Sequence, residues 1–178
     1  FQKKNIKLIT VGRVTDQKDF ITILKALNIV KKSNVELVII GKGEKEIEIK
    51  RYIELNNLNK KVRLLGYKKN PFPYIKQADL FLLSSKFEGL PNVMVEALYL
   101  KKFIISTDCP TGPKEILNNG RFGELVKIGD YKKIAKLIDN FKKTKIVKNK
   151  IKDGYKSLKK YNYKINCEKY YQLIKNYL

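Results

Sequence analysis

The sequence predicts an α/β fold in which a doubly wound, Rossmann-like parallel sheet is covered by helices on both faces. Short apolar runs rich in β-branched residues alternate along the chain with amphipathic stretches of about 10–15 residues, and this alternation is typical of βαβ units. Right-handed crossovers between parallel strands place helices on both faces of the sheet. Several apolar runs end in a glycine or a polar loop, and the carboxyl ends of such strands are where ligands bind in these folds.

The strands are predicted from apolar runs that stop at turn residues. Residues 5–12 (NIKLITVG) and 35–41 (VELVIIG) both end at a glycine, and the second run is typical of a strand buried on both faces. Further strands are predicted at residues 62–66, 78–85, 102–107 and, from a weaker pattern, 123–128.

The helices are predicted from apolar residues that recur with helical spacing. Within residues 18–32 the side chains of Phe20, Ile23 and Leu27 fall on one helical face. Further helices are predicted at residues 44–57, 72–78, 91–101, 130–143, 146–160 and 165–177.

We expect residues 1–178 to form a single domain, because this length is ordinary for one domain with a sizeable core. The chain begins at Phe1 rather than Met, already close to the first predicted strand, which indicates a piece of a longer protein. No apolar run reaches the ~18 residues that a membrane-spanning helix needs.

The charge balance is strongly basic, with 39 Lys and Arg against 17 Asp and Glu and a formal net charge of +22. Such a surplus attracts polyanions, which include nucleic acid, anionic lipid headgroups and phosphorylated ligands. Much of the surplus lies in residues 141–164. The alternative is a solvated lysine-rich face that reflects nothing more than genome composition.

Several kinds of chemistry are excluded or disfavoured by residues that the sequence lacks. With no histidine, the chain has no imidazole base and no histidine-containing zinc site. No carboxylate cluster suggests a metal cage, so we expect no metal and no cofactor. Cys109 and Cys167 lie far apart without a CxxC pattern, which favours a reducing, cytoplasmic setting.

The loop after the first strand, VGRVTDQKDF, contains a candidate anion site. Gly12 permits a tight turn, and Arg13 and Lys18 flank a predicted helix start, where their charges could clamp a diphosphate. The alternative is two ordinary solvated cations. In the loop after the second strand, Gly41, Lys42 and Gly43 let the backbone approach a ligand closely.

The GKG loop lacks the spacing of a dinucleotide-binding GxGxxG and of a P-loop, so a plain strand-to-helix turn is its alternative. After the third strand, backbone groups of residues 64–66 could read the edge of a base, with Tyr67 as a wall beside Leu65 and Gly66. Core packing of Leu64 and Leu65 is the alternative there.

The fourth loop, FEGLPNVMVEAL, precedes and opens a predicted helix. Pro91 suits a first helical turn, and free N–H groups at the helix start would suit a phosphate. Glu88 lies before the helix at its mouth, and Glu96 lies about one turn in, where it could reach along the same crevice. Carboxylates accept hydrogen bonds from paired hydroxyls, so a ribose or hexose would suit them. The alternative is an ordinary surface helix.

In this order, GR-x4-K, GKG and FEGLPNVMVEAL resemble glycosyltransferase family 4, which belongs to the group 1 glycosyltransferases. These are retaining, nucleotide-sugar-dependent enzymes with two Rossmann-like domains, the GT-B architecture. The hallmark of the family is two glutamates separated by seven residues, matched here by Glu88 and Glu96. The resemblance covers residues 5–140 and implies a C-terminal, donor-binding domain.

The resemblance implies a role for each matching residue. Arg13 and Lys18 would hold the diphosphate, Glu88 would bind the donor sugar, and Glu96 would bind the ribose. The backbone N–H groups that would meet phosphate and sugar belong to Gly89, Leu90, Asn92 and Val93. The GKG loop and the end of the third strand would bracket the nucleoside. One departure is Asp19, where the family usually has glycine, and it leaves the local backbone path open.

The resemblance also implies a reaction. A hexosyl or N-acetylhexosaminyl unit would move from a nucleoside diphosphate sugar, with UDP favoured by TDCPTGPKEIL (107–117), to a saccharide or lipid-linked acceptor in bacterial surface glycan synthesis. The segment Thr111–Gly112–Pro113 would form a turn that lines the site or is purely structural. Helices in residues 145–178 would cross to a missing N-terminal domain, and the piece alone would be inactive.

The implied location is cytoplasmic, with peripheral attachment at the anionic inner face of the membrane as a hypothesis from the basic charge. Two rival functions remain. A basic nucleic-acid-binding module would use the charge, although the chain lacks an RNP aromatic set and a zinc knuckle, so no specific nucleic acid is expected. Another GT-B enzyme, such as a nucleotide-sugar epimerase, is the second rival.

Overall fold

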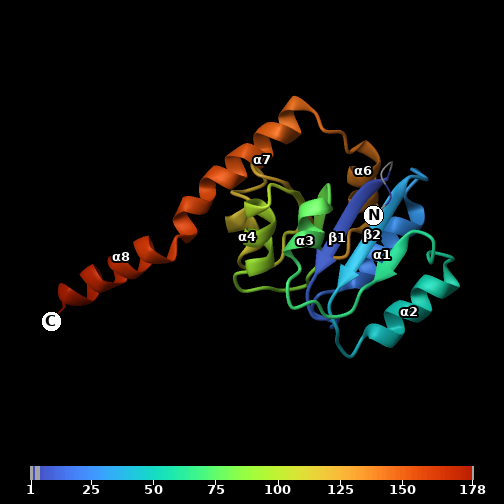
Figure 1. The fold of residues 1–178 in the computed structure, drawn as a ribbon, viewed down its shortest axis with the longest axis horizontal. Coiled ribbons are helices and arrows are strands. Elements are labelled where there is room, and N and C mark those ends of the chain that lie inside the picture. Colours follow the sequence, from blue (N-terminus) through green and yellow to red (C-terminus); the bar gives the residue numbers. More distant parts are fainter. Residues whose placement is uncertain (1, 3–4, 178) are drawn as a thin grey trace.

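The computed structural model describes residue 2 and residues 5–177 (Figure 1). Its centre is a six-stranded sheet in the order β3-β2-β1-β4-β5-β6, in which all neighbouring strands are parallel. The strands are β1 (Ile6–Val11), β2 (Val35–Ile40), β3 (Val62–Leu64), β4 (Leu80–Leu83), β5 (Phe103–Thr107) and β6 (Glu124–Val126). The strand order reverses between β1 and β4, which is the switch point of a doubly wound sheet. The predicted fold class is confirmed.

Helices link the strands and extend the chain beyond β6. They are α1 (Phe20–Ile29), α2 (Glu46–Leu55), α3 (Phe72–Gln77), α4 (Asn92–Tyr99), α5 (Pro113–Ile116), α6 (Tyr131–Asn140), α7 (Lys145–Ser157), the 3₁₀ turn η1 (Leu158–Tyr161) and α8 (Tyr163–Lys175). The short helix α5 was not predicted, because four residues that follow a Gly-Pro turn carry too little periodicity to be seen.

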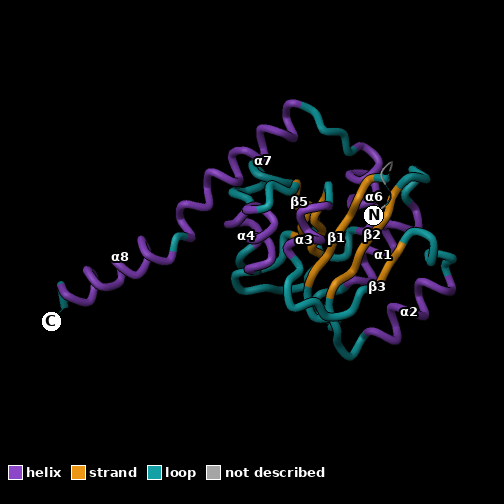
Figure 2. Tube along the Cα trace, viewed as in Figure 1, coloured by secondary structure: helices purple, strands orange, loops and turns teal. Residues whose placement is uncertain are grey.

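The two faces of the sheet carry separate apolar clusters. On one face, α1, α2 and α6 contribute Leu24, Ile49 and Ile134 to the core. On the other face, α3 and α4 contribute Ile75 and Met94. Every residue of β2 is buried, as predicted for a strand covered on both sides. Figure 2 shows the strands side by side with helices around them.

Helix α1 begins two residues later than the predicted start at residue 18. Asp19 is its N-cap and adopts a left-handed conformation with φ 45° and ψ 50°. The Asp19 carboxylate accepts hydrogen bonds from the backbone N–H of Thr22 at 3.3 Å and from the Thr22 hydroxyl at 2.6 Å. An Asp that caps a helix in this way tolerates a backbone conformation that glycine otherwise supplies. Lys18 therefore stands outside the helix, in the preceding loop.

Helix α4 begins at Asn92, and Pro91 is its N-cap with an extended backbone, φ −72° and ψ 92°. The expectation that Pro91 belongs to the first helical turn is thus wrong by one position. The backbone N–H of Met94 donates to the Pro91 carbonyl at 2.8 Å, which closes the first turn.

Of the last two helices, α7 packs on the body of the fold and α8 extends away from it. Gly154 of α7 is buried against Leu98 of α4, where an added Cβ would lie 2.8 Å from a Leu98 methyl carbon. Helix α8 has no buried residue, and Figure 1 shows it continuing away from the sheet. Its apolar side chains, which include Ile165, Tyr170 and Leu173, are all exposed.

Candidate functional site

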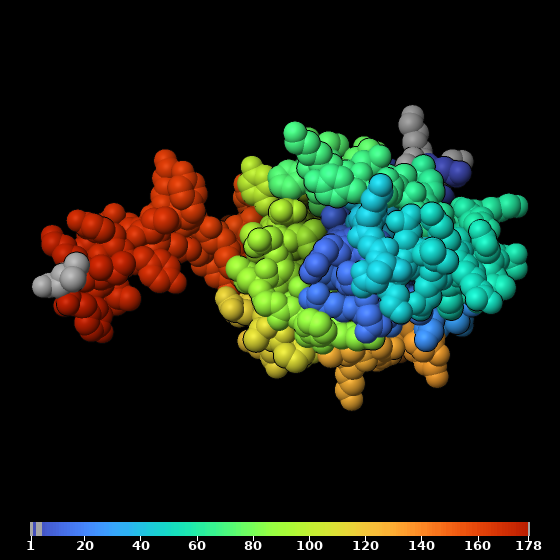
Figure 3. Space-filling model, turned by 90° about the horizontal axis from the view of Figure 1, so that it is seen from below, coloured from blue at the N-terminus to red at the C-terminus, as the bar shows by residue number. Residues whose placement is uncertain are grey.

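The loops that follow β1, β2 and β4 meet at the carboxyl edge of the sheet, which faces the viewer in Figure 3. The backbone N–H of Val14 donates to the Lys42 carbonyl at 3.0 Å and joins the first two loops. The amide of Gln17 donates to the Phe87 carbonyl at 2.9 Å and joins the first loop to the fourth. Residues distant in sequence are thus brought together where a doubly wound sheet binds ligands.

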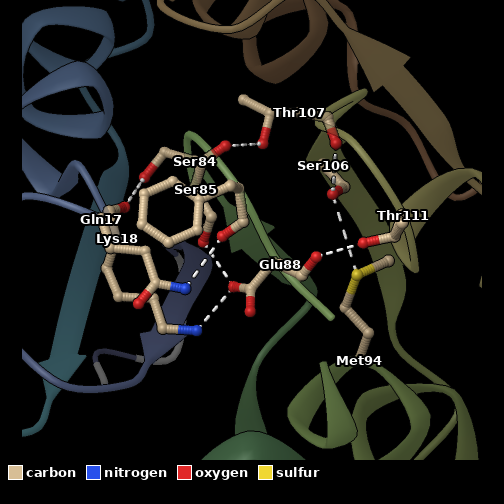
Figure 4. A network of polar contacts seen from close by, with 10 residues as sticks. Gln17, Lys18, Ser84, Ser85, Glu88, Met94, Ser106, Thr107 and Thr111 are labelled. Carbon is tan, nitrogen blue, oxygen red and sulfur yellow. Dashed lines mark hydrogen bonds and ion pairs between the residues drawn. The ribbon is translucent and has the colours of Figure 1, made fainter. Parts of the chain in front are cut away.

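Lys18 and Glu88, predicted on separate loops, form an ion pair at this edge (Figure 4). The Lys18 Nζ donates to Glu88 Oε1 at 2.5 Å. The Ser85 hydroxyl donates to the same carboxylate oxygen at 2.6 Å. Among the described residues, no group donates a hydrogen bond to Glu88 Oε2. Oε1 is thus fixed by Lys18 and Ser85, whereas Oε2 can accept a hydrogen bond from a ligand.

Three buried hydroxyls support this pair, and the sequence analysis missed them. The Ser84 hydroxyl donates to the Lys18 carbonyl at 2.7 Å, and the Thr107 hydroxyl donates to the Ser85 carbonyl at 2.6 Å. Ser84, Ser85 and Thr107 are all fully buried. Buried hydroxyls need partners, so the pair of serines that directly follows the apolar run LFLL was a readable signal.

The glycines of the GKG loop are required by contacts between loops. Gly41 has φ 148°, and a Cβ on it would lie 1.8 Å from the Gly12 carbonyl oxygen. A Cβ on Gly43 would lie 2.3 Å from the Val14 carbonyl oxygen. These distances are shorter than any real contact, so the two loops pack backbone to backbone at these positions. Close contacts between the two loops therefore explain why positions 41 and 43 require glycine.

Arg13 lies on a pocket of about 540 Å³ at the ends of β1, β2 and β3. Its lining comprises Val11, Gly12, Arg13, Ile40, Gly41, Lys42, Tyr67, Lys68, Lys69 and Pro71. Four of these side chains are cationic and none is acidic. The pocket therefore carries a positive potential that suits an anionic ligand.

The end of β3 serves the core and the loop contacts. Leu64 and Leu65 are partly buried and pack against opposite apolar clusters, which bears out the core-packing alternative. The Gly66 carbonyl accepts from the backbone N–H of Gly41 at 2.9 Å, and Gly66 has φ 64°. Tyr67 is exposed and lines the Arg13 pocket. The sequence analysis predicted it as a wall beside a nucleotide base.

Glu96 lines a different pocket from Arg13, one of about 590 Å³ between α3, α4 and the end of α7. Phe72, Tyr99 and Tyr161 give this pocket an apolar lining. Partial burial raises the pKa of the Glu96 carboxyl group. The structure thus brings Lys18 and Glu88 together but places Glu96 on a neighbouring surface of α4.

The backbone at Gly89 has free space where a side chain would be, and its carbonyl oxygen packs against Gly112. An added Cβ on Gly89 would meet no atom within 4 Å, and Leu90 and Asn92 are exposed while Val93 is partly buried. The Thr111 hydroxyl donates to the Glu88 carbonyl. Gly112 has φ 75°, and a Cβ on it would lie 2.0 Å from the Gly89 carbonyl oxygen. The predicted Thr-Gly-Pro turn therefore braces this loop from behind.

Other features bear on the chemistry of the described part of the chain. Within residue 2 and residues 5–177, no group of three or more His, Cys, Asp or Glu side chains could hold a metal ion. Cys109 and Cys167 are free cysteines, and burial raises the pKa of the Cys109 thiol. None of the helices in this described part has both the length and the apolar character needed to cross a bilayer.

A doubly wound parallel sheet with a basic pocket and a part-buried Lys–Glu pair at its carboxyl edge defines a Rossmann-like α/β domain whose strand ends suit an anionic ligand. The family model described as "Glycosyl transferases group 1" matches residues 1–164. The chain belongs to the group 1 glycosyltransferases.

Two curated relatives illustrate the similarity. The chain is 43% identical over 117 residues to an uncharacterized glycosyltransferase of Methanocaldococcus jannaschii, across 65% of this chain and 29% of the relative. It is 31% identical over 157 residues to an N-acetylgalactosamine-N,N'-diacetylbacillosaminyl-diphospho-undecaprenol 4-alpha-N-acetylgalactosaminyltransferase of Campylobacter jejuni, across 86% of this chain and 43% of the relative. The chain thus spans less than half the length of these relatives.

Solved structures show the same fold at lower sequence identity. Staphylococcus aureus TarM, as a mutant in complex with Fondaparinux, alpha-GlcNAc-glycerol and UDP, superposes with a TM-score of 0.88 at 22% identity, across 96% of this chain and 35% of TarM. The pneumococcal O-GlcNAc transferase GtfA, in complex with UDP and GlcNAc, gives 0.84 at 20% identity, across 97% and 36%. The architecture is that of one half of a GT-B glycosyltransferase.

Proposed function

We propose that the chain is the donor-binding domain of a retaining glycosyltransferase of family 4, which transfers a hexosyl or N-acetylhexosaminyl unit from a nucleoside diphosphate sugar. The observation that carries this proposal is the Lys18–Glu88 pair, which is part-buried at the carboxyl edge of the sheet and flanked by the basic Arg13 pocket. A cation and a carboxylate fixed side by side can take up a phosphate and a sugar hydroxyl at adjacent positions.

Each residue has a distinct part in this proposal. Arg13 and Lys18 stabilise the negative charge that grows on the leaving diphosphate, without a metal. Glu88 accepts hydrogen bonds from the donor sugar through Oε2, because Oε1 is already occupied by Lys18 and Ser85. Glu96 accepts hydrogen bonds from the ribose. This role requires the ribose to enter the pocket of about 590 Å³ that Glu96 lines beside α4.

We further propose UDP as the nucleotide and bacterial surface glycans as the product. The Campylobacter jejuni relative is named for N-acetylgalactosaminyl transfer to a diphospho-undecaprenol-linked acceptor. Other relatives are named for amylovoran biosynthesis in Erwinia amylovora and for capsular polysaccharide biosynthesis in Staphylococcus aureus. These names support an acceptor that is a saccharide or a lipid-linked saccharide.

The acceptor would be bound mainly by an N-terminal domain of the same protein, and residues 145–178 would cross to it. The exposed apolar side chains of α8 support this part of the proposal. The domain alone would then bind nucleotide weakly and transfer no sugar. We place the protein in the cytoplasm, held at the anionic inner face of the membrane by its net charge of +22.

A nucleotide panel tests the proposal directly. Isothermal titration calorimetry with UDP, GDP, ADP and their sugars should show saturable binding, tightest for a uridine nucleotide. The Lys18→Met variant should bind at least about tenfold more weakly, because it removes a charged partner of the diphosphate. Absence of saturable nucleotide binding, together with salt-dependent binding to random DNA, would instead favour a nucleic-acid-binding module.

A further inference from the structure

A second basic pocket, of about 420 Å³, lies at the amino edge of the sheet, opposite the candidate donor site. It is formed where β1, β4 and β5 begin and where the chain passes from α6 into α7. Its cationic lining comprises Lys7, Lys76, Lys101, Lys102, Lys143 and Lys148. Asp79 is the acidic residue among its lining residues.

Asp79 cannot neutralise this set of lysines, because it supplies one negative charge against six ammonium groups and both of its carboxylate oxygens are already engaged. Oδ1 pairs with Lys143 Nζ at 2.6 Å, and Oδ2 accepts from the backbone N–H of Lys7 at 2.9 Å. Within the described part of the chain, the ammonium groups of Lys7, Lys76 and Lys148 make no hydrogen bond or ion pair. The pocket thus keeps several positive charges without a counter-charge.

Lys102 is partly buried in this pocket. Its Nζ donates to the carbonyls of Lys76 at 2.7 Å and Ala78 at 2.9 Å, at the end of α3. Burial is the main cause that lowers the pKa of Lys102, Asp79 opposes it, and repulsion from Lys143, Lys7 and Lys76 adds to the lowering. The lysines therefore repel one another inside a concave surface that focuses their field.

We propose that this amino-edge pocket binds a multiply charged phosphate group, independently of the nucleotide sugar. A phosphate presents several oxygens to several ammonium donors at once, and lysine serves phosphate as a point charge. Phe141, Val147 and Ile151 line the same pocket and give it an apolar side. Both free polyphosphate and the phosphate headgroup of a lipid carry this chemistry.

Three double variants of equal charge separate this pocket from non-specific attraction. Lys7→Gln/Lys148→Gln removes two free cations of the pocket. Lys42→Gln/Lys69→Gln removes two cations from the Arg13 pocket. Lys25→Gln/Lys132→Gln removes two exposed lysines outside both pockets. Thermal unfolding midpoints should be equal for all three, because within residues 5–177 none of the substituted ammonium groups makes a hydrogen bond or an ion pair.

The probe is inorganic tripolyphosphate, titrated by calorimetry at fixed ionic strength. We expect the Lys7/Lys148 variant to lose about tenfold in affinity at one of the binding sites, and the Lys25/Lys132 variant to lose less than about twofold. A loss in the Lys42/Lys69 variant alone would assign all binding to the donor edge and overturn the proposal. Equal losses in all three variants would reduce it to non-specific attraction and overturn it as well.

Vesicles distinguish the two sources of phosphate. Flotation with phosphatidylcholine vesicles, with and without phosphatidic acid, is measured on the same three variants. Selective loss of flotation in the Lys7/Lys148 variant would assign the pocket to a lipid headgroup, whereas selective loss with tripolyphosphate alone would assign it to a free anion. A Lys7/Lys148 variant that behaves as the unsubstituted chain with both probes would refute the site.

Discussion

The ammonium nitrogen of Lys18 lies 2.5 Å from Oε1 of Glu88, and the two side chains keep only 14% and 7% of their surface exposed. The pair joins the loop after β1 to the loop after β4, across the switch point of the sheet. Two opposite charges that are largely shielded from water depend on each other, because either one left alone would be a part-buried charge without a partner. The same contact therefore holds the two loops together and supplies the two charged groups of the proposed donor site.

We predict that Lys18→Met and Glu88→Gln each lower the free energy of unfolding by about 3 kcal/mol, since each leaves its partner unpaired. The double variant should lose clearly less than the sum of the two, because it leaves no orphan charge. Urea denaturation of the three variants and the unsubstituted chain gives the coupling energy. Additive losses would mean that the two charges do not stabilise each other.

The pair Lys86–Asp16 is a matched control, because it joins the same two loops at 2.8 Å but is largely solvated. We expect Lys86→Met to change the free energy of unfolding by less than about 1 kcal/mol. Nucleotide affinity should stay within about twofold of the unsubstituted chain. A Lys86→Met variant as damaging as Lys18→Met would assign the effect to net charge and would remove the special role of the part-buried Lys18–Glu88 pair.

Ser85→Ala should make the position of the Glu88 carboxylate less fixed, while the groups proposed to bind the diphosphate stay unchanged. The Ser85 hydroxyl donates to a carboxylate, and such a bond contributes about 2 kcal/mol. We expect the affinity ratio of UDP-glucose to UDP to fall about fivefold in calorimetry, while the affinity for UDP itself changes little.

Ser84→Ala is the comparison, because the Ser84 hydroxyl donates to the Lys18 carbonyl instead. This variant should weaken UDP and UDP-glucose binding by similar factors, since it loosens the backbone of Lys18. If both serine variants left the ratio unchanged, Glu88 would not be the group that selects the sugar.

Gly89→Ala separates ligand approach from folding. An added Cβ there meets no protein atom within 4 Å, so the thermal midpoint should move by less than about 1 °C. If a phosphate approaches this backbone, the methyl group should weaken nucleotide binding about tenfold or more. Gly112→Ala is the contrasting variant, because its Cβ would lie 2.0 Å from the Gly89 carbonyl oxygen and should destabilise the fold. Full nucleotide affinity in Gly89→Ala would place the phosphate elsewhere.

Truncation after Asn162 tests whether α8 belongs to this fold. Helix α8 buries none of its residues, so its removal should leave the thermal midpoint within about 2 °C. Solubility should rise at the same time, because the exposed Ile165, Tyr170 and Leu173 are removed. A fall in the midpoint by many degrees would show that α8 packs on the domain in solution.

The sequence was sufficient for the fold class and for the edge at which Lys18 and Glu88 meet. Alternation of strands and helices determines where the carboxyl ends of parallel strands gather, so residues that follow those strands could be assigned to one edge without coordinates. Two serines directly after a buried strand were a signal of buried hydroxyls, but the role of Ser85 could not be predicted, because it depends on the position of Glu88 and of Lys18 from another loop.

The details that failed depend on the exact path of the backbone. The left-handed cap at Asp19 moved the start of α1, and the extended Pro91 moved the start of α4. Spacing alone could place Glu96 one turn into α4, but the pocket that it lines also depends on Tyr155 and Tyr161, more than fifty residues away.

Glu96→Gln should stabilise the fold while it weakens nucleotide binding. Burial raises the pKa of Glu96 above its ordinary value of 4.5, so the folded state holds the proton more tightly than the unfolded chain does. The stabilising contribution of the protonated group is complete below pH 4.5 and is lost as the pH rises through the folded pKa. At pH 7 the charged carboxylate therefore costs stability, and Gln should relieve this cost.

Because the side chain is only partly buried, solvent screening keeps the expected gain small, about 1–2 °C in Tm at pH 7 and close to zero at pH 4. Loss of a ribose acceptor should nevertheless weaken UDP binding about tenfold. Glu54→Gln, an exposed helical control without a side-chain partner among the described residues, should change neither quantity. A carboxylate that serves a ligand is expected to show a gain in stability together with a loss in UDP affinity when it is neutralised. Unchanged UDP affinity would mean that Glu96 is only a surface residue of α4.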